Sequence, residues 1–208
     1  MFLLNLAFEG EIILPTPSWV SYEPQGILAN NKIHKVETLA EKNWFPSAES
    51  IESIVLKNKN TNYLLFINSP NNPSGQICEN LEEIANIVNK YNITVLSDEI
   101  YSELSFSNEY KSIANFCPER TIISNGLSKW CAAGGWRLGY FVIPNELKNL
   151  RESLKVLASE TFSAVSAPIQ YAAIGAFKNN HHDYLNKSRN ILKMVGEYVY
   201  KNLKSNKV

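Results

Sequence analysis

Short apolar runs alternate with longer stretches of helical periodicity along the chain. The runs that predict strands occupy residues 11–14, 32–36, 62–68, 93–97, 121–124 and 139–143. The run 62–68, NYLLFIN, is continuously apolar, which is typical of a strand buried on both faces, and the last three runs predict buried strands in the same way. The first strand is expected to end at Pro15 and Pro17, because proline cannot donate to a strand ladder.

Apolar residues at helical spacing predict the helices. Ser47 is a candidate N-cap for a helix over 48–57, and the segment 80–91 carries a single apolar stripe. From Asn145 onward the pattern is helical in at least three pieces, of which the last, 184–204, is long. The apolar start of the chain, MFLLNLAF, predicts an amphipathic or buried helix.

The order strand, helix, strand, helix predicts an α/β fold of three layers, with a mostly parallel sheet between two layers of helices. The chain has no internal repeat, low-complexity tract or Gly/Ser-rich linker. In sheets of this kind, ligands bind just beyond the carboxyl ends of the strands. The residues that follow each predicted strand are therefore the candidates for chemistry.

Charge and composition exclude several classes of function. The 208 residues carry 20 Lys and Arg against 20 Asp and Glu, and this zero net charge argues against a nucleic-acid surface. The apolar start lacks a basic flank and soon meets Glu9 and Glu11, so neither a signal peptide nor a membrane span is expected.

Cysteine and histidine usage predicts a reducing, cytoplasmic compartment and no metal site. Cys78, Cys117 and Cys131 are odd in number and far apart, which favours neither a disulfide framework nor a zinc site. None of the three histidines stands near a cysteine in the sequence.

Polar side chains follow two of the predicted buried strands. After 62–68 comes the stiff loop SPNNPSG, which is either a plain strand-to-helix connection or a support that aims the amide of Asn72. Asp98 follows 93–97 and is either a helix N-cap or a carboxylate that faces a cation at the floor of a pocket. Tyr101 lies three residues further on, close to one helical turn, so it could face the same way.

The segment after 121–124, SNGLSKWCAAGGWRLGY, places Lys129 among small and apolar residues. A lone lysine is usually a solvated surface residue, but these neighbours predict a buried amine with a lowered pKa, which is nucleophilic. Arg137 is either an ion-pair partner at the sheet end or a phosphate ligand, for which its planar fork is well suited. A lysine for a Schiff base, an aspartate for a ring nitrogen and an arginine for a phosphate together describe a site for pyridoxal phosphate.

These segments resemble the class I/II aminotransferases, which are fold-type-I enzymes that use pyridoxal 5′-phosphate. SPNNPSG is similar to the family's Asn-Pro-x-Gly loop, SDEIYSEL to its aspartate–tyrosine segment, and GLSKWCAAGGWRLGY to its Schiff-base lysine segment. The segment APIQYAAIGAF is similar to the helix that follows the lysine segment in the family. The resemblance covers nearly the whole chain, but only the middle of a family member.

The resemblance implies a role for each candidate. Lys129 would form the Schiff base and move the proton between substrate and cofactor, and Asp98 would pair with the ring nitrogen. Tyr101 and Asn72 would hydrogen-bond the phenolic oxygen of the ring, and Asn72 would also reach the substrate carboxylate. The phosphate would be bound by Arg137 and Ser128, while the ring would stack on Trp19, which is equally a candidate core aromatic.

The reaction that the resemblance implies is transfer of an amino group from an amino acid to a 2-oxo acid. A pyridoxal-phosphate-dependent carbon–sulfur lyase uses the same lysine, aspartate and arginine and stays open, as does a non-catalytic cofactor-binding remnant. A nicotinamide-binding domain is excluded, since no Gly-x-Gly-x-x-Gly turn follows the first strand.

The sequence also departs from the family pattern. Gly126 stands three residues before the lysine, where the family often has a serine that binds phosphate. The resemblance implies that residues 1–180 are an incomplete cofactor-binding large domain. It also implies that 181–208 begin the long helix toward a small domain, whereas the phosphate-cradling loop lies before residue 1. We therefore expect a homodimer in the full-length form and little activity from the 208 residues alone.

Overall fold

The computed structural model describes residues 1–106, 110–178 and 180–203. Its centre is a six-stranded sheet in the order β2-β1-β3-β4-β5-β6. The strands are β1 (Glu11–Thr16), β2 (Ile33–Glu37), β3 (Tyr63–Asn68), β4 (Thr94–Asp98), β5 (Thr121–Gly126) and β6 (Gly139–Val142). The first five are parallel and β6 is antiparallel to β5, which confirms the predicted α/β fold with a mostly parallel sheet.

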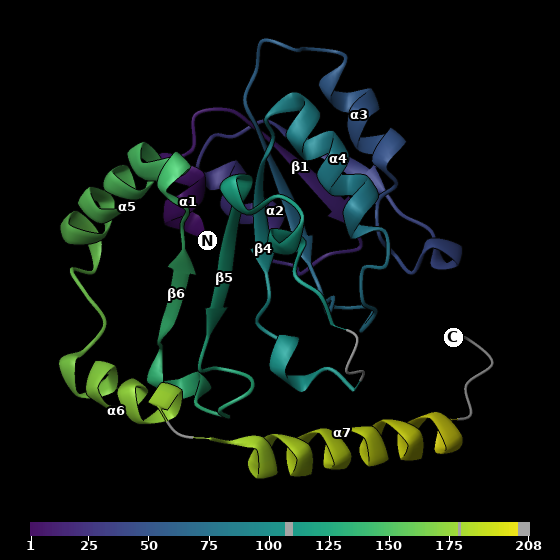
Figure 1. Cartoon of the computed structure of the whole chain (residues 1–208), viewed down its shortest axis with the longest axis vertical. Coiled ribbons are helices and arrows are strands. Elements are labelled where there is room, and N and C mark those ends of the chain that lie inside the picture. Colours follow the sequence, from purple (N-terminus) through teal and green to yellow (C-terminus); the bar gives the residue numbers. More distant parts are fainter. Residues whose placement is uncertain (107–109, 179, 204–208) are drawn as a thin grey trace.

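Seven α-helices lie within the described residues (Figure 1). They are α1 (Phe2–Ala7), α2 (Tyr22–Leu28), α3 (Ala48–Val55), α4 (Leu81–Tyr91), α5 (Lys148–Thr161), α6 (Ala167–Lys178) and α7 (His182–Asn202). Short 3₁₀ turns connect them: η1 (Ala40–Lys42), η2 (Ser102–Leu104), η3 (Ile113–Asn115), η4 (Pro118–Arg120), η5 (Gly134–Trp136) and η6 (Asn145–Leu147). The helices predicted from periodicity are all present, although residue 204, the predicted end of the last one, lies outside the described residues.

Alternation along the central strands divides the core into two layers. On β3, Leu65 and Ile67 pack with α3 and α4 on one face, whereas Leu64 and Phe66 pack with α1, α2 and α5 on the other. All six residues of β3 are buried, as expected for a strand that is covered by helices on both faces.

The strand order reverses at β1, because the chain first crosses to β2 on one side and then to β3 on the other. Such a switch point opens a crevice at the carboxyl ends of the strands, where α/β proteins bind ligands. In Figure 1 these ends point toward the side of the molecule where α6 and α7 lie. The topology therefore places the ends of β1, β3, β4 and β5 along one edge of the sheet.

Two strands differ from the sequence-based expectations. The first strand continues through Pro15 to Thr16, because β1 pairs with β3 only over Glu11–Ile13 and at Pro15 has β2 as its single partner. The predicted buried strand over 139–143 is wrong in its burial: β6 is an edge strand, and its first and last residues are exposed.

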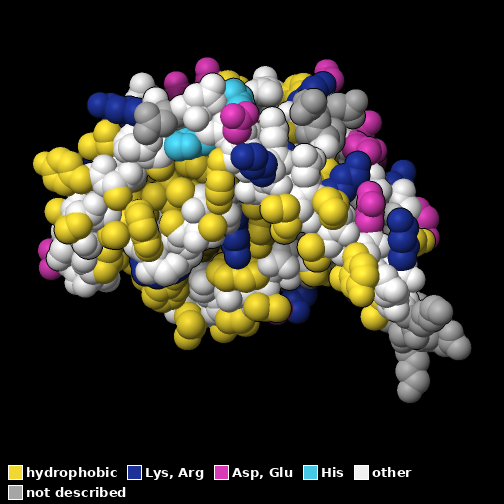
Figure 2. Space-filling view, turned by 90° about the horizontal axis from the view of Figure 1, so that it is seen from below, with side chains coloured by type: hydrophobic (Ala, Val, Ile, Leu, Met, Phe, Trp, Pro, Cys, Tyr) yellow, Lys and Arg dark blue, Asp and Glu magenta, His cyan; other side chains and the backbone are white. Residues whose placement is uncertain are grey.

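The last two helices leave much apolar surface uncovered. In α7 the buried residue is Leu185, and the rest of the helix is half-buried or exposed. Figure 2 shows hydrophobic side chains spread over this end of the molecule. Large exposed apolar side chains include Tyr171, Ile174 and Phe177 of α6 and Ile191, Met194, Val195 and Tyr198 of α7. Among the described residues, no helix is both long and apolar enough to cross a bilayer.

The N-cap of α3 provides a test of the local structure. The side chain of Ser47 accepts a hydrogen bond from the backbone N–H of Ser50 at 3.2 Å. We expect Ser47→Ala to lower the free energy of unfolding by about 1 kcal/mol, because an N–H at the helix start loses its acceptor. Ser53→Ala, a matched change at an exposed position in the same helix, is expected to stay within about 0.5 kcal/mol of wild type in urea denaturation. Equal effects of the two substitutions would contradict the capping role.

Candidate active site

Asp98 is the last residue of β4 and is 9% exposed. Its Oδ2 accepts a hydrogen bond from the Tyr22 hydroxyl at 2.7 Å, and its Oδ1 accepts one from the backbone N–H of Ile100 at 3.3 Å. Burial raises the pKa of the carboxyl group, and these hydrogen bonds offset part of that shift. Asp98 is not the N-cap of a helix, since it ends β4 and its Oδ1 accepts from the backbone N–H of Ile100 in the turn that follows. Its role opposite a cation stays a prediction.

Tyr22 was not among the residues predicted from the sequence. It is the first residue of α2, it is buried, and its ring packs edge-on against Trp19 and Phe66 at centroid distances of 5.3 and 5.1 Å. Burial, followed by the charge of Asp98 and the hydrogen bond to it, raises the pKa of Tyr22, so the hydroxyl remains a donor. Because 76 residues separate Tyr22 from Asp98, no local pattern indicated this pair.

Trp19 lies beyond the end of β1 and is 36% exposed. Trp19 is therefore not a fully buried core aromatic, and its stacking on a ring stays a prediction. The Trp19 ring packs against Tyr22, and the Tyr22 hydroxyl in turn donates to Asp98.

Asn72 and Tyr101 are brought together, as the sequence predicts for residues that follow neighbouring strands. The Asn72 Nδ2 donates to the Tyr101 hydroxyl at 3.4 Å. Asn68, the last residue of β3, was also not predicted from the sequence, and its side chain holds the loop that carries Asn72. Its Oδ1 accepts the backbone N–H of Asn72 at 2.8 Å, and its Nδ2 donates to the carbonyl of Asp98 at 2.9 Å. Asn68 therefore ties the end of β3 to the end of β4.

Lys129 lies in the turn after β5, with its Nζ 5.5 Å from the centroid of the Tyr101 ring. This cation–π contact places the amine next to the tyrosine that the Asn72 amide contacts. The predicted burial of the amine is wrong, because Lys129 is exposed. Its neighbours Leu127 and Trp130 are the buried ones, and they pack away from the amine in a third apolar cluster with α6 and α7.

Arg137 and Ser128 are close in sequence to Lys129, but the structure records no hydrogen bond between them and the other predicted residues in the part of the chain that it describes. Arg137 has a left-handed backbone with φ of 55° and is exposed, and its guanidinium donates to the carbonyl of Gly134. Ser128 is half-buried. Their phosphate-binding role stays a prediction.

Steric crowding explains why residue 126 is a glycine in this structure. A Cβ at this position would lie 2.6 Å from the carbonyl oxygen of Leu138 and 3.0 Å from the Cα of Gly139. The glycine therefore permits the start of β6 to pack closely against the end of β5. A serine at 126 would force these strands apart before it could bind a phosphate.

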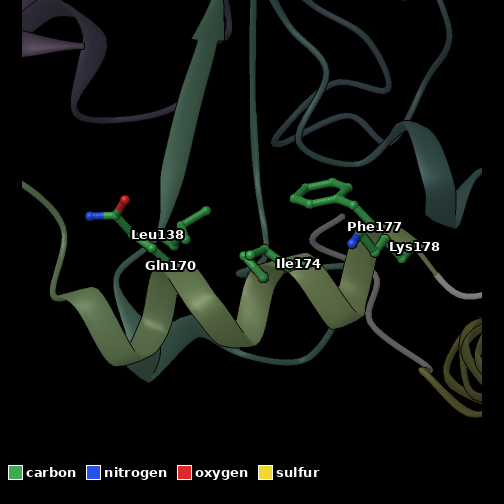
Figure 3. Close-up of a pocket in the computed structure, with 6 residues that line it drawn as sticks. Leu138, Gln170, Ile174, Phe177 and Lys178 are labelled. Carbon is green, nitrogen blue, oxygen red and sulfur yellow. The ribbon is translucent and has the colours of Figure 1, made fainter.

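A hollow in the described surface is separate from the predicted site residues. It has a volume of about 450 Å³ and is lined by Leu138, Gln170, Ala173, Ile174, Phe177 and Lys178. Figure 3 shows that its lining comes mainly from α6, with Leu138 from the segment before β6. The hollow is apolar and contains none of the predicted site residues, so it is no alternative centre for the chemistry.

The donor set at the strand ends fits a cofactor with a basic ring nitrogen and an aldehyde. Asp98 is a buried carboxylate, and no Lys, Arg or His of the described residues lies within 4.0 Å of it. A buried carboxylate is costly unless a cation pairs with it, and a protonated ring nitrogen is such a partner. An accessible primary amine, Lys129, is what an aldehyde requires. Within the described ranges, no cluster of three or more His, Cys, Asp or Glu side chains is placed to share a metal ion.

Comparison with known proteins gives a consistent result. The family model for aminotransferase class I and II matches residues 1–207. An aspartate aminotransferase from Bacillus sp. (strain YM-2) is 35% identical over 209 residues, which cover 98% of this chain and 52% of the relative. An aspartate aminotransferase from Thermotoga maritima is 35% identical over 172 residues, or 81% of this chain and 44% of the relative.

Solved structures show the same fold. The aspartate aminotransferase from Thermus thermophilus with maleate superimposes with a TM-score of 0.89 at 29% identity, over 97% of this chain and 53% of the other. An aromatic aminotransferase from Pyrococcus horikoshii superimposes with a TM-score of 0.86 at 33% identity, over 97% and 55% of the two chains. The chain thus spans about half the length of the relatives that it matches.

The raised pKa of Asp98 has a measurable consequence for the cofactor-free protein. Because the pKa is higher in the folded state, ionisation of Asp98 opposes folding: stability that is present below the unfolded pKa is lost as pH rises through the folded pKa. We expect Asp98→Asn, which keeps an acceptor for Tyr22, to be more stable than wild type at neutral pH. The gain should be about 1.4 kcal/mol for each unit by which the pKa is raised, and it should vanish toward pH 4.

Urea denaturation over a pH series measures this difference. Glu119→Gln, which removes an exposed carboxylate in η4, is the matched control, and its difference from wild type should change little with pH. A constant difference between Asp98→Asn and wild type across the whole series would show that burial does not govern the titration of Asp98.

Proposed function

The chain belongs to the class I and II aminotransferase family, and from that premise we propose that its site binds pyridoxal 5′-phosphate and transfers an amino group from an amino acid to a 2-oxo acid. The main support is one juxtaposition at neighbouring strand ends. A buried carboxylate, Asp98, lies beside a hydrogen-bonded pair, Asn72 and Tyr101, and the Lys129 amine contacts the ring of that tyrosine.

Asp98 would hold a proton at the ring nitrogen of the cofactor. Tyr22 keeps one carboxylate oxygen of Asp98 in place through a 2.7 Å hydrogen bond, so the other oxygen is oriented for a partner. When bound, pyridoxal phosphate supplies an electron sink that stabilises negative charge at the α-carbon of the substrate. A fixed anion at Asp98 strengthens that sink, because it stabilises the protonated ring.

Lys129 would bind the cofactor covalently and, once a substrate amine has replaced it, would carry a proton to and from the α-carbon of the substrate. The exposed position of its amine suits this exchange, since the amine must leave and return without breaking a core contact. Tyr101 lies under the amine and would donate its hydroxyl to the phenolic oxygen of the cofactor, with the Asn72 amide beside it. Asn72 would also orient the substrate carboxylate.

The remaining predicted residues would orient the two ends of the cofactor. Arg137 and Ser128 would bind the phosphate, which requires the Arg137 guanidinium to exchange the Gly134 carbonyl for a phosphate oxygen. Trp19 would stack on the ring, and its contact with Tyr22 links that position to Asp98.

The named relatives indicate which substrates to assay first. Several of them are aspartate aminotransferases, so we propose an acidic amino acid such as aspartate as donor, with a 2-oxo acid as acceptor. Formation of a new amino acid from the acceptor separates transamination from the carbon–sulfur lyase reaction, which releases thiol and ammonia instead.

We further propose that residues 1–180 act as the cofactor domain, that 181–208 lead toward a smaller domain, and that the working form is a homodimer. The apolar side chains that α6 and α7 expose support an interface at this end of the molecule. Sedimentation of the full-length protein at micromolar concentration should give the mass of two chains, and the mass of one chain would contradict the proposal.

Lys129 gives the direct test of the proposed function. With added pyridoxal phosphate, borohydride reduction and peptide mass spectrometry should place the label on Lys129 of the wild-type protein. We expect Lys129→Ala to lose the label and to lower any transamination about a hundred- to ten-thousandfold, because both the anchor and the proton carrier are removed.

Lys178→Ala removes an exposed amine on α6 and is the matched control, which should keep both label and rate. If the label appears on another lysine, or if Lys129→Ala retains full activity, the proposed function is wrong. Asp98→Ala should keep the Lys129 amine but bind pyridoxal phosphate weakly, which separates attachment from affinity.

A further inference from the structure

Glu99 is a second buried carboxylate next to Asp98, and nothing in the proposed chemistry uses it. Its side chain is 7% exposed. The Oε1 accepts hydrogen bonds from the hydroxyl of Ser97 at 3.0 Å and from that of Ser112, and Tyr110 hydrogen-bonds the same carboxylate. Burial, followed by the charge of Glu99, raises the pKa of Tyr110, so its hydroxyl also remains a donor.

Asp98 and Glu99 point to opposite faces of the sheet. Asp98 meets Tyr22, which packs with Phe66 in the layer of α1, α2 and α5. Glu99 meets Ser112, whose neighbour Ile113 belongs to the layer of α3 and α4. The backbone N–H of Glu99 also donates to the carbonyl of Ser124 on β5 at 2.9 Å, which fixes the residue between two strands. Two adjacent carboxylates are thus held rigidly at the end of one strand.

The surroundings of Glu99 contain hydroxyl groups and no cation. Of the residues that the structure describes, no Lys, Arg or His lies within 4.0 Å of its carboxylate. Hydroxyl donors stabilise the anion without neutralising it, so its field reaches its neighbours through a poorly screening interior. A neutral amide keeps one acceptor oxygen in place of two, so Glu99→Gln removes the charge while its Oε1 can still accept from Ser97 and Ser112.

We propose that Glu99 is a positioning residue of the cofactor site, whose buried anionic carboxylate acts through Asp98 to hold the proton on the ring nitrogen of pyridoxal phosphate. This inference rests on the proposed function. Asp98 makes the direct contact, and Glu99 makes loss of the shared proton less favourable by placing a second negative charge behind it. Glu99 itself is separated from the ring, because it faces the opposite layer of the sheet.

The other groups that act on Asp98 come from several elements. Burial raises its pKa most, and the charge of Glu99 also raises it, whereas the Tyr22 hydroxyl on α2 and the Ile100 N–H lower it. The effect of Glu99 is therefore distinct in sign from those of the other polar groups around Asp98. Its removal should lower the pKa of Asp98 while the removal of Tyr22 should raise it.

The test compares Glu99→Gln with wild type by two readouts. In the cofactor-free protein, carbon-13 NMR of the Asp98 carboxyl should show its pKa falling in the variant. With cofactor, the affinity for pyridoxal phosphate should fall about three- to tenfold, because the ring proton is less stabilised. An analogue in which a C–H group replaces the ring nitrogen carries no such proton, so its affinity should not change.

Two further variants make the result decisive. Glu103→Gln removes an exposed carboxylate in η2 and should leave both readouts at wild-type values. Ser112→Ala removes one hydrogen-bond donor but keeps the charge of Glu99, so it tests only how Glu99 anchors its segment. This variant should change the affinities for pyridoxal phosphate and for the analogue by the same factor. The proposal is overturned if Glu99→Gln lowers the affinity for both ligands equally, if it has the same effects as Ser112→Ala, or if it leaves the pKa of Asp98 unchanged. Glu99 would then only anchor the 110–113 segment.

Failure of the proposed function gives a different result. A wild-type protein that attaches no pyridoxal phosphate to Lys129 overturns that function, and with it the cofactor role of Glu99, regardless of the Asp98 titration. A different result would overturn only the role of Glu99. In that case wild type is labelled at Lys129, but Glu99→Gln changes the affinities for pyridoxal phosphate and for the analogue equally.

Discussion

The burial of the Asp98 carboxylate is the constraint on which the site depends. A carboxylate at 9% exposure loses most of its hydration, and the structure compensates with a 2.7 Å hydrogen bond from Tyr22 and a local one from the backbone of Ile100. That arrangement requires α2 to pack on one face of β4. The contacts of Tyr22 with Trp19 and Phe66 fix α2 there, so the position of the Asp98 carboxylate depends on this aromatic cluster.

The parallel sheet converts distant sequence positions into neighbours. Since β3, β4 and β5 run in the same direction, the segments that follow them meet at one edge, and Asn72, Tyr101 and Lys129 come into contact there. The amide of Asn68 binds both the Asn72 loop and the end of β4, which holds this edge in register. The loops at this edge are therefore held by hydrogen bonds to backbone and asparagine groups, whereas the strands are held by their alternating apolar side chains.

Most of the architecture and the candidate site residues at the strand ends could be predicted from the sequence. The side chains that hydrogen-bond and position those residues could not. Periodicity located the strands and helices, and the rule that ligands meet strand ends selected Asn72, Asp98 and Lys129. Tyr22 was missed because it contacts Asp98 across 76 residues, and Asn68 because a strand-terminal asparagine has no distinctive local pattern. The exposure of Lys129 was missed because apolar neighbours in sequence can pack on the far side of a turn, as Leu127 and Trp130 do.

The two chemical halves of the site are supported by different parts of the fold. Asp98 is fixed by Tyr22, which packs in the core layer of α1, α2 and α5. Lys129 instead lies on a turn whose anchors, Leu127 and Trp130, pack with Ala173 of α6 and Leu185 of α7. The opposite surfaces of those two helices are exposed and apolar. The position of the amine therefore depends on how firmly α6 and α7 are held, whereas the carboxylate is held within the core.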